Sequence, residues 1–141
     1  MGTSPDVDES LTLEQIEDHR WGNPPADATR LIKTVYELRH KPISAMDIED
    51  LRLLLLQQES LDVLVPVALN HLEQNPLAEG DFYPGDLLTA VLKSPHAYWQ
   101  QHPDQYRRAS AVITAVEALG NLDDKDAPHD TIWQQIHIFR G

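Results

Sequence analysis

The apolar residues of this chain recur at the spacing of an α-helix along nearly all of its length. Residues 26–39 give a clear example. Their apolar positions follow the i, i+3, i+4, i+7 pattern of one helical face, at Ala28, Leu31, Ile32, Val35 and Leu38. Outside the C-terminal end, no segment shows the strict alternation of apolar and polar residues that indicates a half-buried strand. This periodicity predicts an all-α fold.

Proline and glycine interrupt the pattern so often that the helices must be short. Proline lacks the backbone donor and glycine costs conformational entropy in a helix, so both tend to end it. Between these breaks we expect a single compact domain of about six to seven short helices. They are expected over residues 11–16, 26–39, 44–58, 61–72 and 87–93, in a short piece opened by residues 94–95, and over 103–119.

A few polar and proline residues indicate where these helices begin. Ser44 and Asp86 are expected to be N-caps, since their short side chains can accept a hydrogen bond from a free backbone N–H group of the first turn. Pro66 lies inside the 61–72 pattern. That helix therefore either begins near Val65 or is kinked at the proline.

The chain contains no cysteine, which excludes disulfides, thiolate metal sites and a cysteine nucleophile. Its 141 residues are enough for one domain with a substantial core. The first ten residues lack the basic and apolar stretches of a secretion signal, and the longest apolar run, Leu53 to Leu56, is too short to span a bilayer. We therefore expect a soluble protein of the cytoplasm.

Acidic residues outnumber basic ones by 23 to 11, which gives a net charge of −12 with neutral histidines. Proteins that bind nucleic acids need clustered Lys and Arg, and anionic membranes repel a chain with this charge. Neither a nucleic acid nor a membrane is therefore an expected partner. The 40 residues between Arg52 and Lys93 hold no Lys or Arg but six acids: Glu59, Asp62, Glu73, Glu79, Asp81 and Asp86. Cations gather just before them, at Arg30, Lys33, Arg39, Lys41 and Arg52. This distribution suits a basic protein partner, and the alternative is an acidic face that serves solubility alone.

Signs of catalysis are weak. None of the seven histidines lies at metal-ligand spacing from another, and the chain has no G-x-S-x-G motif and no glycine-rich phosphate loop. Asp81 and Asp86 could form an acid–base pair in a cleft, but a turn residue and a helix cap explain them more simply. The sequence predicts no catalytic residue, no metal site and no cofactor.

The aromatic residues of the acidic stretch allow two interpretations. Phe82 and Tyr83 fall in the expected loop over residues 77–85, and Tyr98 and Trp99 follow shortly after it. Exposed aromatics bordered by acids are good interface anchors. Alternatively, Phe82 and Tyr83 fill the core beneath the loop, as Trp21 is expected to do elsewhere.

Several short motifs resemble, in order and spacing, one family of bacterial proteins. They are Trp21 to Thr29, Leu38 to Pro42, Asp50 to Leu53, Leu64 to Leu69, Asn75 to Leu77 and, most specific, Glu79 to Leu88. Together they resemble small immunity proteins of contact-dependent growth inhibition (CDI) systems over residues 11–119. Outside that helical core we expect a flexible N-terminus over residues 1–10. Residues 120–141 are expected to form an acidic linker and then a helix over 131–139 or a short strand over 136–139.

The resemblance implies a cytoplasmic antidote that binds and neutralises the C-terminal toxin domain of a large cell-surface protein delivered by a neighbouring cell. Many such toxins are nucleases, and a basic ribonuclease domain would match the charge of this chain. Binding would block the toxin's active site or an exosite. Contacts are expected at acids and aromatics of the acidic stretch and just beyond it: Glu59, Asp62, Glu73, Glu79, Asp81, Tyr83 and Trp99.

Two functions of other classes remain open from the residues alone. One is an acidic adaptor that binds another basic protein, for example by mimicking the nucleic acid which that protein holds. The other is a hydrolase or metal enzyme that uses the scattered histidines and acids.

Overall fold

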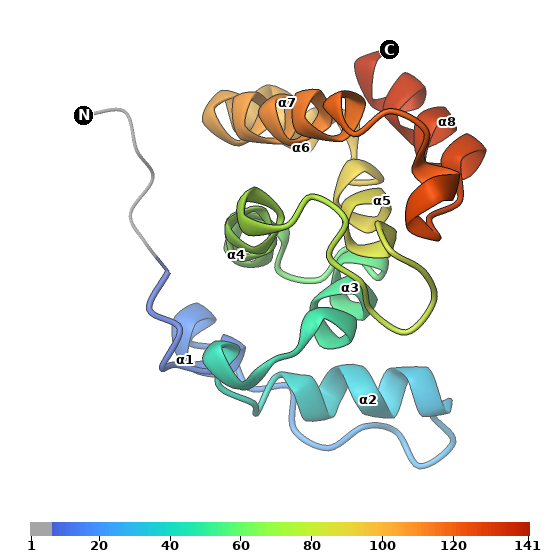
Figure 1. Ribbon diagram of the computed structural model, residues 1–141. Helices are drawn as coiled ribbons and strands as arrows, with labels where there is room; N and C mark the ends of the chain where they lie inside the picture. Colours follow the sequence, from blue (N-terminus) through green and yellow to red (C-terminus); the bar gives the residue numbers. More distant parts are fainter. Residues whose placement is uncertain (1–6) are drawn as a thin grey trace.

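The computed structural model describes residues 7–141, and these residues form helices joined by short turns (Figure 1). The α-helices are α1 (Leu13–Glu17), α2 (Arg30–Leu38), α3 (Ile48–Leu56), α4 (Leu61–Gln74), α5 (Asp86–Leu92), α6 (His96–Gln101), α7 (Pro103–Ala118) and α8 (His129–Arg140). Two 3₁₀ helices, η1 (Ile43–Ala45) and η2 (Leu122–Lys125), lie between them. The described part of the chain contains no strand, only an isolated β-bridge between Glu79 and Pro84. The predicted all-α fold is confirmed, with one or two more helices than expected.

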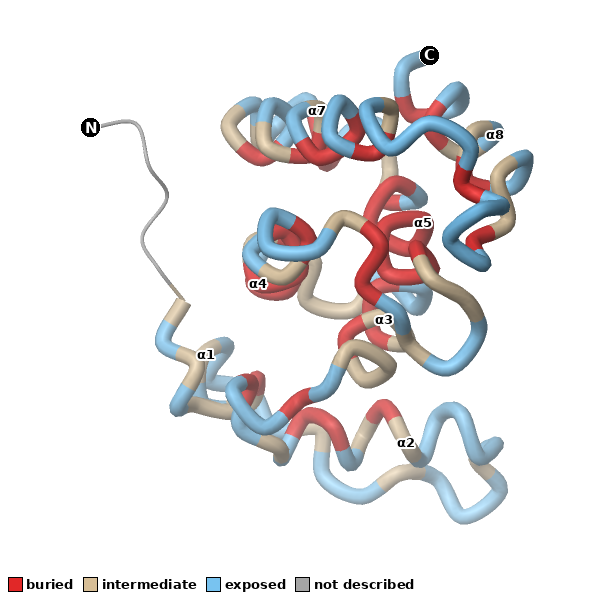
Figure 2. Tube along the Cα trace, viewed as in Figure 1, coloured by how far each residue is buried: buried red, intermediate tan, exposed pale blue. Residues whose placement is uncertain are grey.

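Helix α5 lies at the centre of the fold, and all of its residues are buried (Figure 2). It packs against α3, α4 and α8, while α7 covers α4 and α6 lies along α7 (Figure 1). Helix α2 lies at the edge of the molecule and packs on α3. A helix that is buried on all sides must be apolar nearly all round, as the sequence from Leu87 to Leu92 is.

Two helix starts differ from the sequence-based expectation because of their caps. Helix α2 begins at Arg30 rather than near Ala26, since the Thr29 hydroxyl accepts a hydrogen bond from the backbone of Ile32 at 3.2 Å. Ser44 is not the N-cap of α3. Asp47 takes that position and forms a reciprocal capping box with Asp50, and Ser44 lies in η1 instead.

The sequence left two alternatives open, one at Pro66 and one at the C-terminal end, and the structure has a helix at both places. Helix α4 begins at Leu61 and continues through Pro66, so the alternative start near Val65 is wrong. The expected acidic linker contains η2, and the C-terminal segment is the helix α8 rather than a strand. Residues 1–6 of the expected flexible N-terminus lie outside the described residues, whereas the carbonyl of Glu9 accepts a hydrogen bond from the Ser44 amide at 2.8 Å.

A buried cation ties the N-terminal segment to the end of α2. The Arg39 side chain, only 3% exposed, pairs with Glu17 at 2.8 Å and donates to the His19 carbonyl at 3.3 Å. Its guanidinium also lies 4.4 Å from the centre of the Trp21 ring, which is partly buried against the core as expected. Arg39 therefore stabilises the fold and adds no positive charge to the surface.

The C-terminal helix α8 is fitted closely to the start of α5. Gly85, the residue before α5, has a φ of +95°, and a Cβ added there would lie 2.7 Å from the Cδ1 atom of Ile132 in α8. Ile132 itself is fully buried. Glycine is therefore needed at position 85 both for its backbone conformation and for the approach of α8.

We expect Gly85→Ala to lower the free energy of unfolding by about 1–3 kcal/mol, because it adds left-handed strain and a clash with Ile132. In an Ile132→Val background, which removes the clashing methyl group, the cost should fall towards the strain alone, about 1 kcal/mol. Urea unfolding of the four proteins measures this double-mutant cycle. An equal cost in both backgrounds would contradict the contact.

Candidate functional site

Residues 77–85, which join α4 to α5, form the most distinctive surface element of the molecule; we call them the 77–85 loop. At its tip the Phe82 side chain is 68% exposed, the highest value among the large apolar residues of the described chain. Exposed single apolar residues are ordinary, but this one belongs to a loop whose backbone is held at almost every position. The sequence-based alternative in which Phe82 fills the core is wrong.

The carboxylate of Asp86 holds the loop from within. Asp86 is 2% exposed, and its oxygens accept hydrogen bonds from the amides of Gly80 at 2.6 Å, Phe82 at 3.1 Å and Tyr83 at 3.4 Å. The expected role of Asp86 as the N-cap of α5 is therefore wrong, since Gly85 occupies that position. A buried carboxylate must be compensated, and here the compensation comes from the loop backbone and from a nearby cation.

That cation is Arg52 in α3, which also binds a second carboxylate under the loop. Its guanidinium donates to both oxygens of Glu49, at 2.7 and 2.6 Å, and its Nε lies 3.8 Å from Asp86. Glu49 in turn accepts a hydrogen bond from the Asp81 amide at 2.9 Å. The four successive amides of residues 80–83 are thus all bound by two carboxylates, the buried one of Asp86 and the partly buried one of Glu49.

Two further contacts fix the shape of the loop. A Cβ at Gly80 would lie 2.6 Å from Glu49 Oε1 and 3.1 Å from Asp86 Oδ2, so only glycine lets the backbone approach the carboxylates this closely. The Tyr83 hydroxyl lies 3.0 Å from the Thr89 hydroxyl in α5. The neighbouring aromatics of the loop therefore differ, with Tyr83 partly buried on α5 and Phe82 exposed.

Two predicted contact residues, Glu79 and Asp81, lie on the exposed side of this loop. Within residues 7–141, neither carboxylate forms a salt bridge or accepts a hydrogen bond. The Asp81 charge does act on Arg52, whose pKa is raised chiefly by its hydrogen bond to Glu49 and further by the nearby carboxylates. Tyr83, the third predicted residue here, contributes its partly buried ring.

The other four predicted contact residues lie elsewhere. Glu59 lies near Glu17 and the buried Arg39; burial raises its pKa and the Arg39 charge opposes this effect. Glu73 is bound by Arg108 at 2.8 and 2.9 Å, which lowers its pKa. Glu73 therefore has a local structural role that the sequence pattern did not reveal, and Glu59 is partly buried rather than exposed.

Asp62 and Trp99 differ from each other in exposure. Asp62 is exposed in the first turn of α4. Trp99 is 5% exposed and packs edge-on against Phe139, with ring centres 5.2 Å apart. The Trp99 ring can therefore affect a partner only through the residues that cover it.

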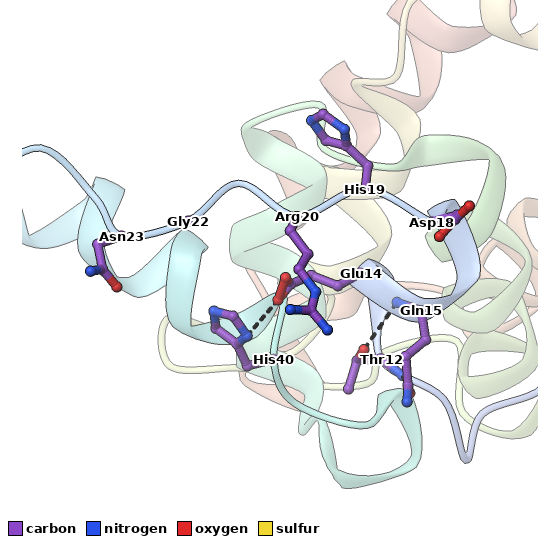
Figure 3. Close-up of a pocket in the computed structure, with 9 residues that line it drawn as sticks. All are labelled: Thr12, Glu14, Gln15, Asp18, His19, Arg20, Gly22, Asn23 and His40. Atoms are coloured by element: carbon purple, nitrogen blue, oxygen red, sulfur yellow. Dashed lines mark hydrogen bonds and ion pairs between the residues drawn. The ribbon is translucent and has the colours of Figure 1, made fainter.

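A second feature of the surface is a polar hollow beside α1 (Figure 3). Its lining combines acids, histidines and one arginine, and within it the Glu14 carboxylate lies 2.5 Å from the Nδ1 atom of His40. The His19 side chain points away from this pair (Figure 3). Because charges of both signs meet here, the hollow has less negative charge to offer a basic partner than the 77–85 loop.

The arrangement of the titratable side chains bears on metal binding and on acid–base chemistry. In the described chain, no group of three or more His, Asp and Glu side chains could hold a metal ion. The possible acid–base pair of Asp81 and Asp86 is separated in role, since Asp86 is buried under loop amides and Asp81 is exposed. Nor does any helix among residues 7–141 have the length and apolar character needed to cross a membrane.

A family model described as CDI immunity proteins matches residues 15–109, which is well over half of the chain. The matched segment contains α2 to α6 and the whole 77–85 loop, and ends within α7. Neither the curated proteins nor the solved structures contain a match.

The buried carboxylate of Asp86 gives a direct test of the loop. Asp86→Ala removes the acceptor for three amides and leaves Arg52 with one fewer partner, so we expect a loss of about 3 kcal/mol or more in unfolding free energy. The matched control is Asp81→Ala, which removes an exposed carboxylate five residues away and should change stability by less than about 0.5 kcal/mol. Urea unfolding measures both variants, and similar losses would contradict the assignment.

Glu49 should make stability depend on pH. The hydrogen bond from Arg52, helped by the Asp81 amide and opposed by burial, lowers the pKa of Glu49 below its ordinary value of 4.5. The unfolded chain then binds the proton more readily, so this contribution is complete above that value and is lost as the pH falls through the lowered pKa. The stability difference between wild type and Glu49→Gln should therefore be largest near pH 7 and shrink on acidification below about pH 4.5. A constant difference from pH 7 to pH 3 in urea unfolding would contradict this role.

Proposed function

The chain belongs to the family of CDI immunity proteins, and from this premise we propose that it binds a basic nuclease toxin domain with the acidic surface around its 77–85 loop. As an immunity protein it neutralises a CDI toxin. The ribonuclease activity of that toxin, the site of contact and the cytoplasm as the place of encounter are parts of the proposal.

The observation that carries the contact site is the state of Glu79 and Asp81. Both carboxylates project from a loop that is already fixed by Asp86, and neither forms a salt bridge in the described chain, although the Asp81 charge acts on Arg52 from a greater distance. By contrast, Glu49 and Glu73 are neutralised by arginines. Unpaired charges on a rigid support are the groups that a basic partner can bind without first breaking an internal ion pair.

The inhibitor would act by occupation rather than by chemistry. A nuclease holds phosphate with Lys and Arg, and the carboxylates of the loop would stand where phosphate groups otherwise lie. Long-range attraction between the −12 chain and a basic domain would also accelerate their encounter. Either the active site or a neighbouring exosite of the toxin could be covered in this way.

The double variant Glu79→Lys/Asp81→Lys tests this contact. Reversal of two charges at the loop should weaken binding of the cognate toxin domain by at least about tenfold at low salt, with little change in stability, since both side chains are exposed. Isothermal titration calorimetry gives the affinity, and survival of toxin-exposed cells gives the protection.

The matched control is Asp27→Lys/Glu37→Lys, which changes the net charge equally at two exposed acids next to or within α2. It should reduce the association rate slightly and leave the dissociation rate unchanged. Equal weakening by the two double variants would show that only total charge matters, and unchanged binding by both would reject the loop as the contact.

A further inference from the structure

Packing inside the molecule does not explain the exposure of Phe82. Its ring is 68% exposed, while Tyr83 beside it occupies the inward position and meets Thr89 in α5. The described chain has one other large apolar residue of comparable exposure, Ile138 at 62% in α8. Phe82 differs from Ile138 because it lies at the tip of a loop bordered by the unpaired Asp81 and Glu79.

The loop holds this aromatic ring in a fixed place before any partner arrives. The amide of Phe82 is bound by Asp86 and the amide of Asp81 by Glu49. An element that is already ordered loses less conformational entropy on binding than a flexible loop does. An exposed aromatic residue on a loop whose backbone is held by several internal hydrogen bonds is typical of a binding element.

Arg52 supports the ring from below. Its guanidinium carbon lies 4.3 Å from the centre of the Phe82 ring, within the range of a cation–π contact. Two hydrogen bonds to Glu49 hold the same guanidinium in place. The cation–π contact therefore favours one position of the Phe82 ring. The ring therefore rests on one rigid support while most of its surface faces solvent.

We propose that Phe82 is the apolar anchor of the toxin complex and enters an apolar pocket whose rim carries Lys or Arg residues of the toxin domain. This inference rests on the proposed function and deepens it by separating two parts of the contact. Phe82 would supply the buried apolar centre, and Glu79 and Asp81 the charged rim, as in interfaces with a dry core and a polar border.

The surrounding charge favours the toxin domain over a second copy of this chain. Two copies meeting at this surface would bring Glu79 and Asp81 against their own equivalents, with a net charge of −12 on each side. Like charges at an interface cost binding energy, whereas a basic domain gains it. The occupant of the surface is thus the toxin domain, and self-association at this surface is an outcome that the test can reveal.

The test compares Phe82→Ala with the matched control Ile138→Ala in titrations against the cognate toxin domain. We expect Phe82→Ala to weaken binding by about 30-fold or more, mostly through faster dissociation, and Ile138→Ala to change it by less than about threefold. Both side chains are mostly exposed, so the unfolding midpoints should stay near that of wild type. The variant Phe82→Leu, which keeps an apolar side chain of similar reach, should fall between wild type and Phe82→Ala.

Salt separates the anchor from the rim. Loss of affinity in Phe82→Ala should persist at about 0.5 M NaCl, where exposed charges are strongly screened, while the effect of Glu79→Lys/Asp81→Lys should largely disappear. If Phe82→Ala and Phe82→Leu both bind like wild type while the lysine variant binds weakly, the anchor is refuted and the charged contact stands. If all three bind like wild type, both proposals fail. Dimerisation of the free protein that Phe82→Ala abolishes would assign the ring to a second copy instead.

Discussion

The candidate site depends on the hydrogen bonds between the buried carboxylate of Asp86 and the backbone of the 77–85 loop. Asp86 begins the central helix α5, yet its oxygens point back into the 77–85 loop and bind three of its amides. An unpaired carboxylate at this depth would cost far more than a hydrogen bond is worth, so the loop and Arg52 must remain in place for α5 to stay buried. The packing of α5 in the core and the shape of the loop at the surface therefore both depend on the Asp86 carboxylate.

The acidic residues of this chain divide into two kinds with different functions. Glu17, Glu49 and Glu73 are paired with arginines and stabilise local structure. Glu79 and Asp81 remain unpaired in the described chain, so they contribute most directly to an external field. A net charge alone does not distinguish these two kinds of acid, and in the proposed complex a basic partner meets mainly the second.

Helix α8 lies outside the segment that matches the family model, yet it takes part in the same structure. Gly85 immediately precedes Asp86, and the Ile132 side chain of α8 packs where a Cβ of Gly85 would lie. Helix α8 therefore supports the end of the 77–85 loop that leads into α5. The hollow beside α1, in contrast, carries both signs of charge, and no residue of the 77–85 loop lines it. The support from α8 and the absence of mixed charge favour the 77–85 loop over the hollow as the proposed contact surface.

The all-α class, the approximate helix positions and the loop over residues 77–85 could be predicted from the sequence, because helical periodicity and proline or glycine breaks are local signals. The sequence also placed Glu79 and Asp81 at the surface correctly. Three features could not be predicted in this way: Asp86 binds the loop, Glu49 accepts a hydrogen bond from the Asp81 amide, and Phe82 is exposed. The reason is distance along the chain: Glu49 and Asp81 are 32 residues apart, and their contact exists only after α3 packs against α5. Local patterns indicate which residues are polar or apolar, but packing decides which of them meet.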